Sequence, residues 1–292
     1  MAQDRVFPEE FGYHFSNGNF EQIYRQTVQD FQLQMDMETF REAAADFSRN
    51  AGSFELKHSN QLEPGIRRYQ WVDTGDARMI TAAYNSAGDI IGIQFDIYEQ
   101  FTSDREVTIN TYRLPFEGEW FVLWGGNDAF LNYHYPYEHQ RYAYDFIRKV
   151  DGSAFEGDAE MLESYHAFGS SIVAPRGGEV VKVVDDAEDN LPHYPNMSAP
   201  EGNHIIISHG YNEYSLLAHL RKHSVTAKAG DTVETGERIA QCGNSGASDT
   251  PHLHFHVMDG VDPYTSKSIR IQFSPSGEPR QGDRVWGRSG QC

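Results

Sequence analysis

The feature that most constrains this chain is a run of alternating histidines near its C-terminal end, Pro251-His252-Leu253-His254-Phe255-His256. In a β-strand, residues i, i+2 and i+4 face the same side and lie about 6.5 to 7 Å apart. The run therefore predicts a strand with three imidazoles on one face and apolar residues on the other. Such imidazoles can share a metal ion, or one can bind metal while another transfers protons. A solvated polar strand face is the alternative interpretation.

Short strand-like segments punctuated by glycines precede this run. They comprise residues 171–175, 179–184, 204–209, 214–220 and 238–242. Their length and spacing predict an all-β barrel or sandwich. The stretch 185–202 contains three prolines and many acidic residues, which indicates an irregular insertion.

The N-terminal part has a different pattern. Residues 8–50 contain helix formers and apolar residues at helical spacing, and three strand-like segments follow at 67–72, 79–84 and 90–98. Helices followed by an antiparallel meander make a small α+β domain. The pattern resembles the nuclear-transport-factor-2-like or cystatin-like domains that precede some bacterial peptidases. We therefore expect an α+β domain over 1–105, a mainly-β domain over 106–275 and an extended tail over 276–292.

The net charge of the 292-residue chain is −19. Residues 1–112 carry 9 Lys and Arg against 18 Asp and Glu, and the remainder carries 15 against 25. The acidity is thus spread over both halves, which disfavours nucleic acid and anionic membranes as partners. No apolar run reaches the roughly 18 to 20 residues of a membrane-spanning helix.

The first residues contain no apolar core of a signal peptide. We therefore expect either a cytoplasmic protein or a chain whose export signal has been removed. The two cysteines, Cys242 and Cys292, are too few for a disulfide framework or a cysteine zinc site. They either pair with each other or remain free.

Several short motifs occur in a fixed order. G-D-x-V-x-x-G-x-x-I begins at Gly230, G-x-x-G spans 243–246, and P-H-L-H-F begins at Pro251; Leu217-Ala218-His219-Leu220 precedes them. Together they resemble the lysostaphin (LytM)-type zinc metallopeptidases over some two fifths of the chain, from about Ala143 to Gly260. The resemblance implies an antiparallel β-sandwich or barrel with a groove, one zinc ion and hydrolysis of peptide bonds.

The family has a His and an Asp as further zinc ligands ahead of this region. Asp145 matches the Asp, but the common His-x-x-x-Asp spacing places Arg141 where the His stands, and a guanidinium cannot bind zinc. His134 and His139 are the two candidates for the missing ligand. The order W-G-G, N-x-H, Q-R-x-A-x-D resembles a branch of the family in which His134 is the ligand, and His139 is kept as the alternative.

The resemblance implies a role for each residue. His134, Asp145 and His254 hold one zinc ion, with a water in the fourth position. His252 and His219 match the family's two non-ligand histidines. We assign His252 as the general base and His219 to the stabilisation of the oxyanion.

His256 stands where the family commonly has Glu. It either orients a metal ligand from outside the coordination sphere or is a plain strand residue.

The resemblance implies an endopeptidase acting on bacterial peptidoglycan, in the periplasm or outside the cell. A secreted protein or peptide is the alternative substrate. A catalytically silent LytM-like protein that regulates cell-wall remodelling is the alternative function. A lipoyl-type carrier barrel is disfavoured, because no lysine lies between Lys228 and Lys267 to be modified.

Overall fold

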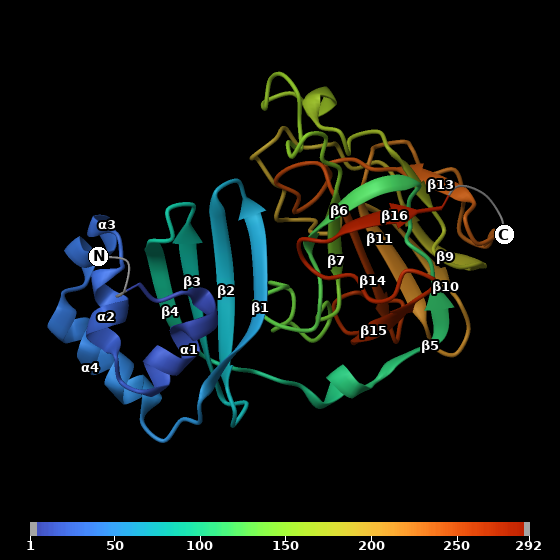
Figure 1. Ribbon diagram of the computed structural model, residues 1–292. Helices are drawn as coiled ribbons and strands as arrows, with labels where there is room; N and C mark the ends of the chain where they lie inside the picture. Colours follow the sequence, from blue (N-terminus) through green and yellow to red (C-terminus); the bar gives the residue numbers. More distant parts are fainter. Residues whose placement is uncertain (1–4, 289–292) are drawn as a thin grey trace. The chain divides into compact units, whose positions relative to one another are not determined.

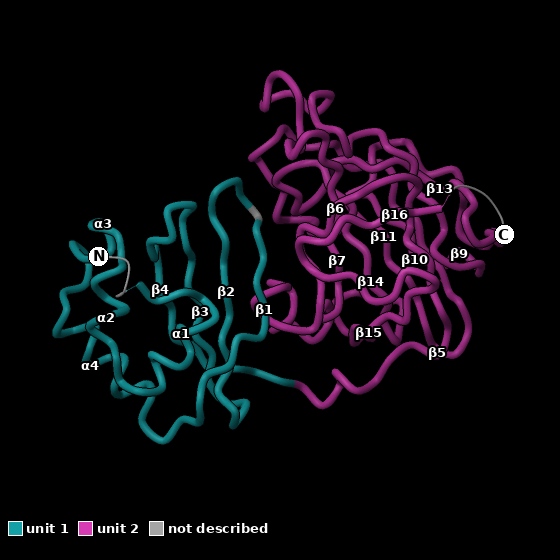
Figure 2. The backbone as a smooth tube through the Cα atoms, viewed as in Figure 1, with its two compact units in different colours: residues 1–100 teal, residues 101–292 magenta. Residues whose placement is uncertain are grey.

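A computed structural model describes residues 5–288, which form two compact units divided between Gln100 and Phe101 (Figure 2). The division lies five residues before the expected one at 105/106. The reason is the short 3-10 helix η1 (Thr102–Arg105), which is bonded into the second unit. The Asp104 carboxylate accepts hydrogen bonds from the hydroxyls of Tyr135, at 2.7 Å, and Tyr142, at 2.8 Å.

The first unit is a set of helices followed by an antiparallel meander, so the predicted α+β class is confirmed (Figure 1). Its elements are α1 (Pro8–Ser16), α2 (Phe20–Arg25), α3 (Gln29–Gln34), α4 (Met37–Ser48), β1 (Phe54–Glu63), β2 (Ile66–Asp73), β3 (Arg78–Asn85) and β4 (Ile90–Ile97). The sequence did not indicate β1, because that segment is largely polar and lacks clear alternation. Membership of a nuclear-transport-factor-2-like or cystatin-like family stays a prediction.

Aromatic side chains form the core between the helices and one face of this sheet. Phe11 of α1 stacks on Trp71 of β2 with ring centroids 4.2 Å apart, and both are fully buried. Gly12 permits this approach, since a Cβ there would lie 2.0 Å from the Phe54 carbonyl oxygen. Large buried rings of this kind contribute most of the apolar burial in a small domain.

The second unit is built on one large, mostly antiparallel sheet with the strand order β12-β9-β10-β11-β14-β7-β6-β16, and the predicted mainly-β class is confirmed. Strand β15 pairs with β14 and, in parallel, with β5, while β8 and β13 form a separate pair. Its elements are β5 (Val107–Tyr112), β6 (Gly118–Trp124), β7 (Tyr144–Ile147), η2 (Leu162–Ser164), β8 (Ser171–Val173), β9 (Gly178–Val184), β10 (Asn203–Ser208), β11 (Tyr214–Leu220), β12 (Thr232–Val233), β13 (Arg238–Gln241), β14 (Leu253–Met258), β15 (Ser268–Phe273) and β16 (Arg284–Gly287).

Strands β7, β14 and β11 lie side by side within this sheet (Figure 1). In the register, His254 of β14 lies opposite Asp145 of β7 on one side and Ala218 of β11 on the other. The alternate residues Leu253 and Phe255 point into the apolar core. The strict alternation of β14 therefore turns its histidines to the opposite face of the sheet.

The described part of the expected tail, residues 276–288, is not extended throughout. Strand β16 pairs with β6 and extends the large sheet. Gln281 is almost fully buried, and its side chain donates a hydrogen bond of 3.0 Å to the Leu123 carbonyl oxygen. Cys292 lies outside the described residues, and Cys242 is buried with a free thiol.

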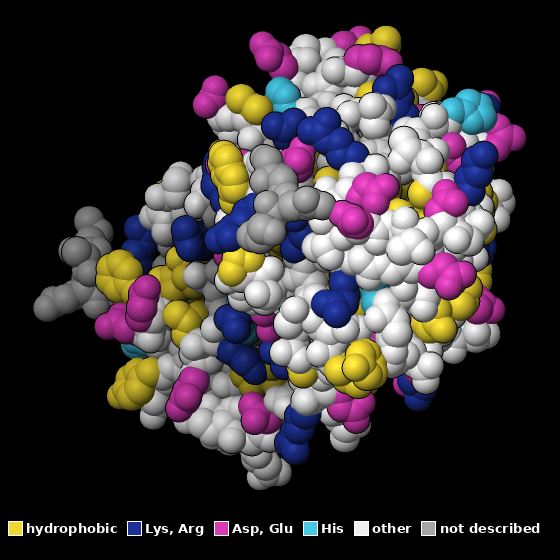
Figure 3. Space-filling model, turned by 90° about the vertical axis from the view of Figure 1, so that its right-hand side faces the viewer, with side chains coloured by type: hydrophobic (Ala, Val, Ile, Leu, Met, Phe, Trp, Pro, Cys, Tyr) yellow, Lys and Arg dark blue, Asp and Glu magenta, His cyan; other side chains and the backbone are white. Residues whose placement is uncertain are grey.

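Within residues 5–288, no helix is both long and apolar enough to cross a bilayer. Acidic side chains on the face drawn in Figure 3 are interspersed with basic ones and do not gather in one patch. This agrees with the even distribution of charge along the chain.

A buried polar cluster joins β5 to the turn between β10 and β11. The Glu213 carboxylate is buried and accepts hydrogen bonds from the backbone amides of Ile109 and Asn110, the Asn110 side chain at 2.8 Å and the Tyr112 hydroxyl at 2.9 Å. These four donors offset the cost of burying a carboxylate.

His209 lies beside this cluster, with its ring edge-on to Tyr112. Its Nδ1–H donates to the Gly177 carbonyl oxygen at 3.0 Å, and Nε2 lies 2.8 Å from the Ser215 hydroxyl. Burial, with a smaller contribution from Arg176, lowers the pKa of His209 from its ordinary 6.5 to about 4. The histidine is therefore neutral in the folded protein at physiological pH.

This difference in pKa predicts an acid-sensitive stability. As the pH falls from about 6.5 to 4, the unfolded chain binds a proton at His209 that the folded chain does not, so the free energy of unfolding decreases. Between pH 7 and pH 5 we expect a loss of about 2 kcal/mol from this residue. Urea unfolding at both pH values should show that loss reduced in His209→Gln and retained in the exposed control His223→Gln; equal losses in all three proteins would contradict the assignment.

Candidate metal centre

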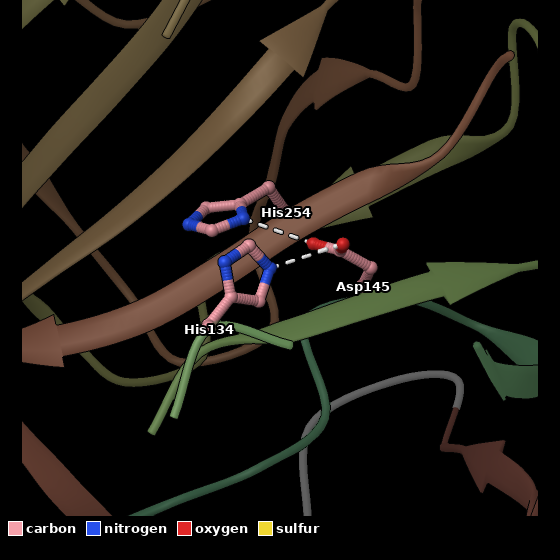
Figure 4. Close-up of side chains that lie close together, drawn as sticks. All are labelled: His134, Asp145 and His254. Carbon is pink, nitrogen blue, oxygen red and sulfur yellow. Dashed lines mark hydrogen bonds and ion pairs between the residues drawn. The ribbon is translucent and has the colours of Figure 1, made fainter. Parts of the chain in front are cut away.

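Three buried side chains converge on one face of the large sheet. His134, Asp145 and His254 offer ligand atoms that all lie within 4.8 Å of one another. The Asp145 carboxylate lies 3.1 Å from His134 Nε2 through one oxygen and 2.9 Å from His254 Nδ1 through the other. Figure 4 shows both imidazoles turned toward this carboxylate, His134 from a loop and His254 from β14. Two imidazole nitrogens and a carboxylate oxygen are a donor set that suits a divalent transition metal.

The electrostatics of Asp145 favour its ionised form. Burial raises the pKa of this carboxyl group, but electrostatic interactions with His134 and His252 and hydrogen bonds from His134 and His254 outweigh burial and hold the pKa well below its ordinary value. Burial lowers the pKa of His254, which favours the neutral imidazole that a metal requires. The set thus combines a carboxylate with neutral imidazole, which fits a cation.

His134 is positioned by a compact loop between β6 and β7. The Asn132 side chain donates to the carbonyl oxygens of Gly126, Arg141 and Ala143 at 3.0 to 3.2 Å. Its Oδ1 accepts the backbone amide of His134 at 3.0 Å. The buried side-chain amide of Asn132 therefore closes the loop and fixes the position of the His134 backbone relative to Asp145.

Arg141, at the position of the family's usual ligand, serves as a structural clamp. Its guanidinium lies 3.3 Å from the centroid of the Phe101 ring and donates to the Tyr135 carbonyl oxygen at 3.0 Å and to Ser103 Oγ at 3.1 Å. These contacts join the start of the second unit to the loop that carries His134. The arginine stabilises the loop and is not among the residues converging on Asp145.

His139 is not among the three converging residues, although it lines the same cavity as His134. It is partly exposed, and its ring packs near Tyr137. Of the two candidates for the missing ligand, His134 is the one placed against Asp145.

The ring of His256 contacts the ring of His254. The His254 Nε2 and His256 Nδ1 atoms are 3.0 Å apart, and both rings are buried. If His254 held a metal ion through Nδ1, its hydrogen would stand on Nε2 and would be donated to His256. His256 is therefore placed to select the tautomer and orientation of His254.

His219 owes its position to a β-bulge. The register between β10 and β11 shifts by one residue between the pairs Asn203–Leu220 and Ile205–Leu217, and His219 itself has a φ of 60°. A bulge of this kind redirects one side chain out of the regular alternation. The His219 ring lies 4.7 Å from the ring of His252 and 5.8 Å from that of His254, by centroids.

The G-x-x-G turn supports this arrangement through its backbone. A Cβ on Gly243 would lie 2.4 Å from the backbone of Arg221, and the backbones of Gly202 and Gly246 approach so closely that neither accepts a side chain. This packing places the Ser245 carbonyl oxygen 2.9 Å from His219 Nδ1. Because a carbonyl only accepts, Nδ1 carries the hydrogen, and the Nε2 lone pair is left for the site.

His252 stands just before β14, which begins at Leu253, so the prediction that all three histidines share one strand is wrong for this residue. Its ring is held by Thr250 and Ser248. Nδ1–H donates to the Thr250 carbonyl oxygen at 2.8 Å, and the Ser248 hydroxyl lies 3.1 Å away. Nε2 lies 3.8 Å from Asp145 Oδ1. The site therefore presents two Nε2 lone pairs, from His252 and His219, beside the converging residues.

Tyr133 is a neighbour of the site that sequence reasoning missed. Its hydroxyl donates to Asp145 Oδ2 at 3.3 Å, and its ring packs 3.9 Å from that of His134 by centroids. Its adjacency to His134 in the chain was the available signal, but the direction of its side chain depends on the loop.

Comparison with known families agrees with this geometry. Residues 163–266 match the model of Peptidase family M23. The chain therefore carries a peptidase family M23 domain, which is the family of the lysostaphin-type resemblance. The matched segment contains His219, His252 and His254. His134 and Asp145 precede it in the chain.

Curated relatives match over a limited part of their length. The chain is 38% identical over 102 residues to an uncharacterized metalloprotease of Haemophilus influenzae, covering 34% of this chain and 19% of that protein. It is 32% identical over 75 residues to the peptidoglycan DD-endopeptidase ShyA of Vibrio cholerae, covering 26% and 17%. The chain thus spans about a fifth of the length of the relatives that it matches.

Solved structures align with low scores. The M23 metalloprotease pseudoalterin, from the deep sea, aligns at 16% identity and a TM-score of 0.37 over 62% of this chain and 96% of that one. The catalytic domain of lysostaphin from Staphylococcus simulans aligns at 18% identity and a TM-score of 0.29 over 58% and 95%. Since both TM-scores lie below 0.5, these alignments carry no argument about function.

The contact between His254 and His256 leads to a prediction about metal affinity. We expect His256→Leu to weaken the binding of a divalent metal by about 10- to 100-fold, because loss of an outer partner of a ligating histidine has effects of this size. His256→Gln retains an acceptor for His254 and should stay within a few-fold of the wild type. Competition with a chromophoric chelator would measure both; equal affinities for the Leu and Gln variants would argue that His256 is a plain strand residue.

Proposed function

We propose that this protein is a zinc-dependent endopeptidase that hydrolyses peptide bonds in bacterial peptidoglycan outside the cytoplasm. The observation that carries the proposal is the convergence of His134, Asp145 and His254 beside two imidazoles that present free Nε2 atoms. Membership of the M23 domain family supports the reaction class. The likeness to ShyA, named as a peptidoglycan DD-endopeptidase, supports the substrate.

Each residue of the site has a distinct role in the proposed hydrolysis. His134, Asp145 and His254 would hold the zinc ion, which when bound polarises a scissile carbonyl and acidifies a water. His252 Nε2 carries no hydrogen and lies close to Asp145, so it can take a proton from an attacking water. His252 is accordingly the proposed general base.

His219, like His252, carries its hydrogen on Nδ1 and presents Nε2 to the metal centre. The contact to Ser245 keeps the resting hydrogen on Nδ1, so Nε2 would donate to the oxyanion only once it receives the proton that His252 takes from the attacking water. The rings of His252 and His219 lie 4.7 Å apart by centroids. His219 would therefore stabilise the oxyanion in its protonated form during the reaction, and it is not protonated at Nε2 in the resting site. Both histidines then touch the reacting groups, as catalytic residues must.

Digestion of purified peptidoglycan tests the proposal, with mass spectrometry of the released fragments. The zinc-loaded wild type should release cleaved cross-links. His254→Ala should release none above background, and His252→Ala should lose at least about 100-fold in rate, the lower range for a positioned acid–base group. The loop histidine substitution His166→Ala is a matched control and should retain full activity.

Two results would contradict the proposal. Release of the same products by His254→Ala would place the chemistry elsewhere. Binding of peptidoglycan without cleavage by the zinc-loaded wild type would instead favour a catalytically silent regulatory protein.

A further inference from the structure

A cavity of about 320 Å³ opens beside the converging residues of the metal centre. His134, His219, His254 and His256 line one side of it. Its size is at the lower end of small-molecule sites, so it can hold one side chain or chain end of a bound peptide. Because the cavity adjoins the reacting residues, whatever it holds lies next to the scissile bond.

Part of the lining of the cavity is apolar. Leu216 and Ala218 come from β11, and Ala247 comes from the loop after the G-x-x-G turn. Leu216 and Ala218 are almost fully buried in a small apolar cluster with Ile206. These apolar side chains favour the aliphatic part of a substrate residue.

The only carboxylate among the residues that line the cavity belongs to Glu201, and no lysine or arginine lines it. Tyr264, also in the lining, donates its hydroxyl hydrogen to Glu201 Oε2 at 2.7 Å. Burial, followed by the contact with Glu201, raises the pKa of Tyr264 to about 12, so this hydroxyl remains a donor at neutral pH. A second carboxylate oxygen of Glu201 is left to accept from a ligand.

Glu201 is also fixed relative to the catalytic residues. Its carbonyl oxygen accepts the backbone amide of His219 at 3.1 Å. The next residue, Gly202, packs against Ser245, since a Cβ on Gly202 would lie 2.4 Å from the Ser245 carbonyl carbon. The backbone that carries this carboxylate is therefore anchored both to His219 and to the G-x-x-G turn.

We infer that this cavity is a specificity subsite for a primary ammonium group on the substrate, with Glu201 as the residue that pairs with it. The inference rests on the proposed peptidase function and adds the substrate class. The ammonium group can come from an amino side chain or from the free amino end of a short peptide. Acetylation removes the charge of either source but also adds an acetyl group. The near-isosteric exchange Glu201→Gln removes only the charge of the protein, so it discriminates charge recognition from fit.

The experiment uses a set of short alanine- and glycine-rich peptides that contain one lysine. In one pair of peptides the lysine amine is free or acetylated, and in a second pair the N-terminal amine is free or acetylated. We expect the wild type to show a preference of about fivefold in kcat/KM for the free amine of one pair, as a half-exposed ion pair provides. Glu201→Gln should remove that preference.

The matched control is Glu179→Gln, which removes the same charge at an exposed position outside the cavity. It should keep the wild-type preference. If Glu179→Gln and Glu201→Gln lower the preference equally, the overall acidity of the chain causes it, and the subsite is refuted. Equal turnover of free and acetylated peptides by the wild type would also refute it.

Calorimetric binding of the same peptides separates this inference from the proposed function. Tighter binding of a free-amine peptide by the wild type, lost in Glu201→Gln, supports the subsite even if no peptide is cleaved. Equal binding of free and acetylated peptides overturns the subsite and leaves the peptidase function to the peptidoglycan assay.

Discussion

The shared carboxylate of Asp145 is the interaction on which the arrangement of the site depends. It is buried, ionised and contacted by imidazoles from two other segments, one through each oxygen. A buried carboxylate is costly unless donors or a cation compensate it. The loop of His134 and the strand of His254 therefore have to meet at β7, and a divalent cation at this point would satisfy all three groups together.

Backbone features then add the remaining imidazoles. The bulge in β11 turns His219 out of the strand alternation, and the close backbone contact at Gly202 and Gly246 holds its Nδ1 on Ser245. His252 is held just before β14 by Thr250. Both rings consequently present the same nitrogen to the site, and this common orientation follows from carbonyl acceptors in loops and not from the strands themselves.

The sequence predicted the parts of this design that depend on local pattern. Apolar segments of six or seven residues bounded by turn residues, such as β9, β10 and β11, were found where expected, and the histidine run correctly indicated a strand at His254 and His256. Strand β7 was not predicted, because a buried run of only four residues is too short to stand out in the sequence. The position of His252 was missed because a carbonyl contact, and not strand geometry, fixes its ring.

Spacing alone did not identify the first metal-site residue, and the choice of His134 came from the family resemblance. His134 and His139 differ little in their distance along the chain from Asp145, and only the loop closed by Asn132 determines which one reaches it. The role of Arg141 likewise depends on its contact with Phe101, which lies 40 positions earlier in the printed sequence. Chain spacing carries no information about such contacts.

The most direct test is X-ray absorption spectroscopy at the zinc edge, with the imidazole contribution counted in three proteins loaded with one equivalent of zinc. The account predicts two imidazoles for the wild type and for His139→Ala, and one for His134→Ala. An imidazole count that falls in His139→Ala and is unchanged in His134→Ala would contradict the assignment of the metal centre. Failure of the wild type to retain zinc after dialysis would contradict the presence of such a centre altogether.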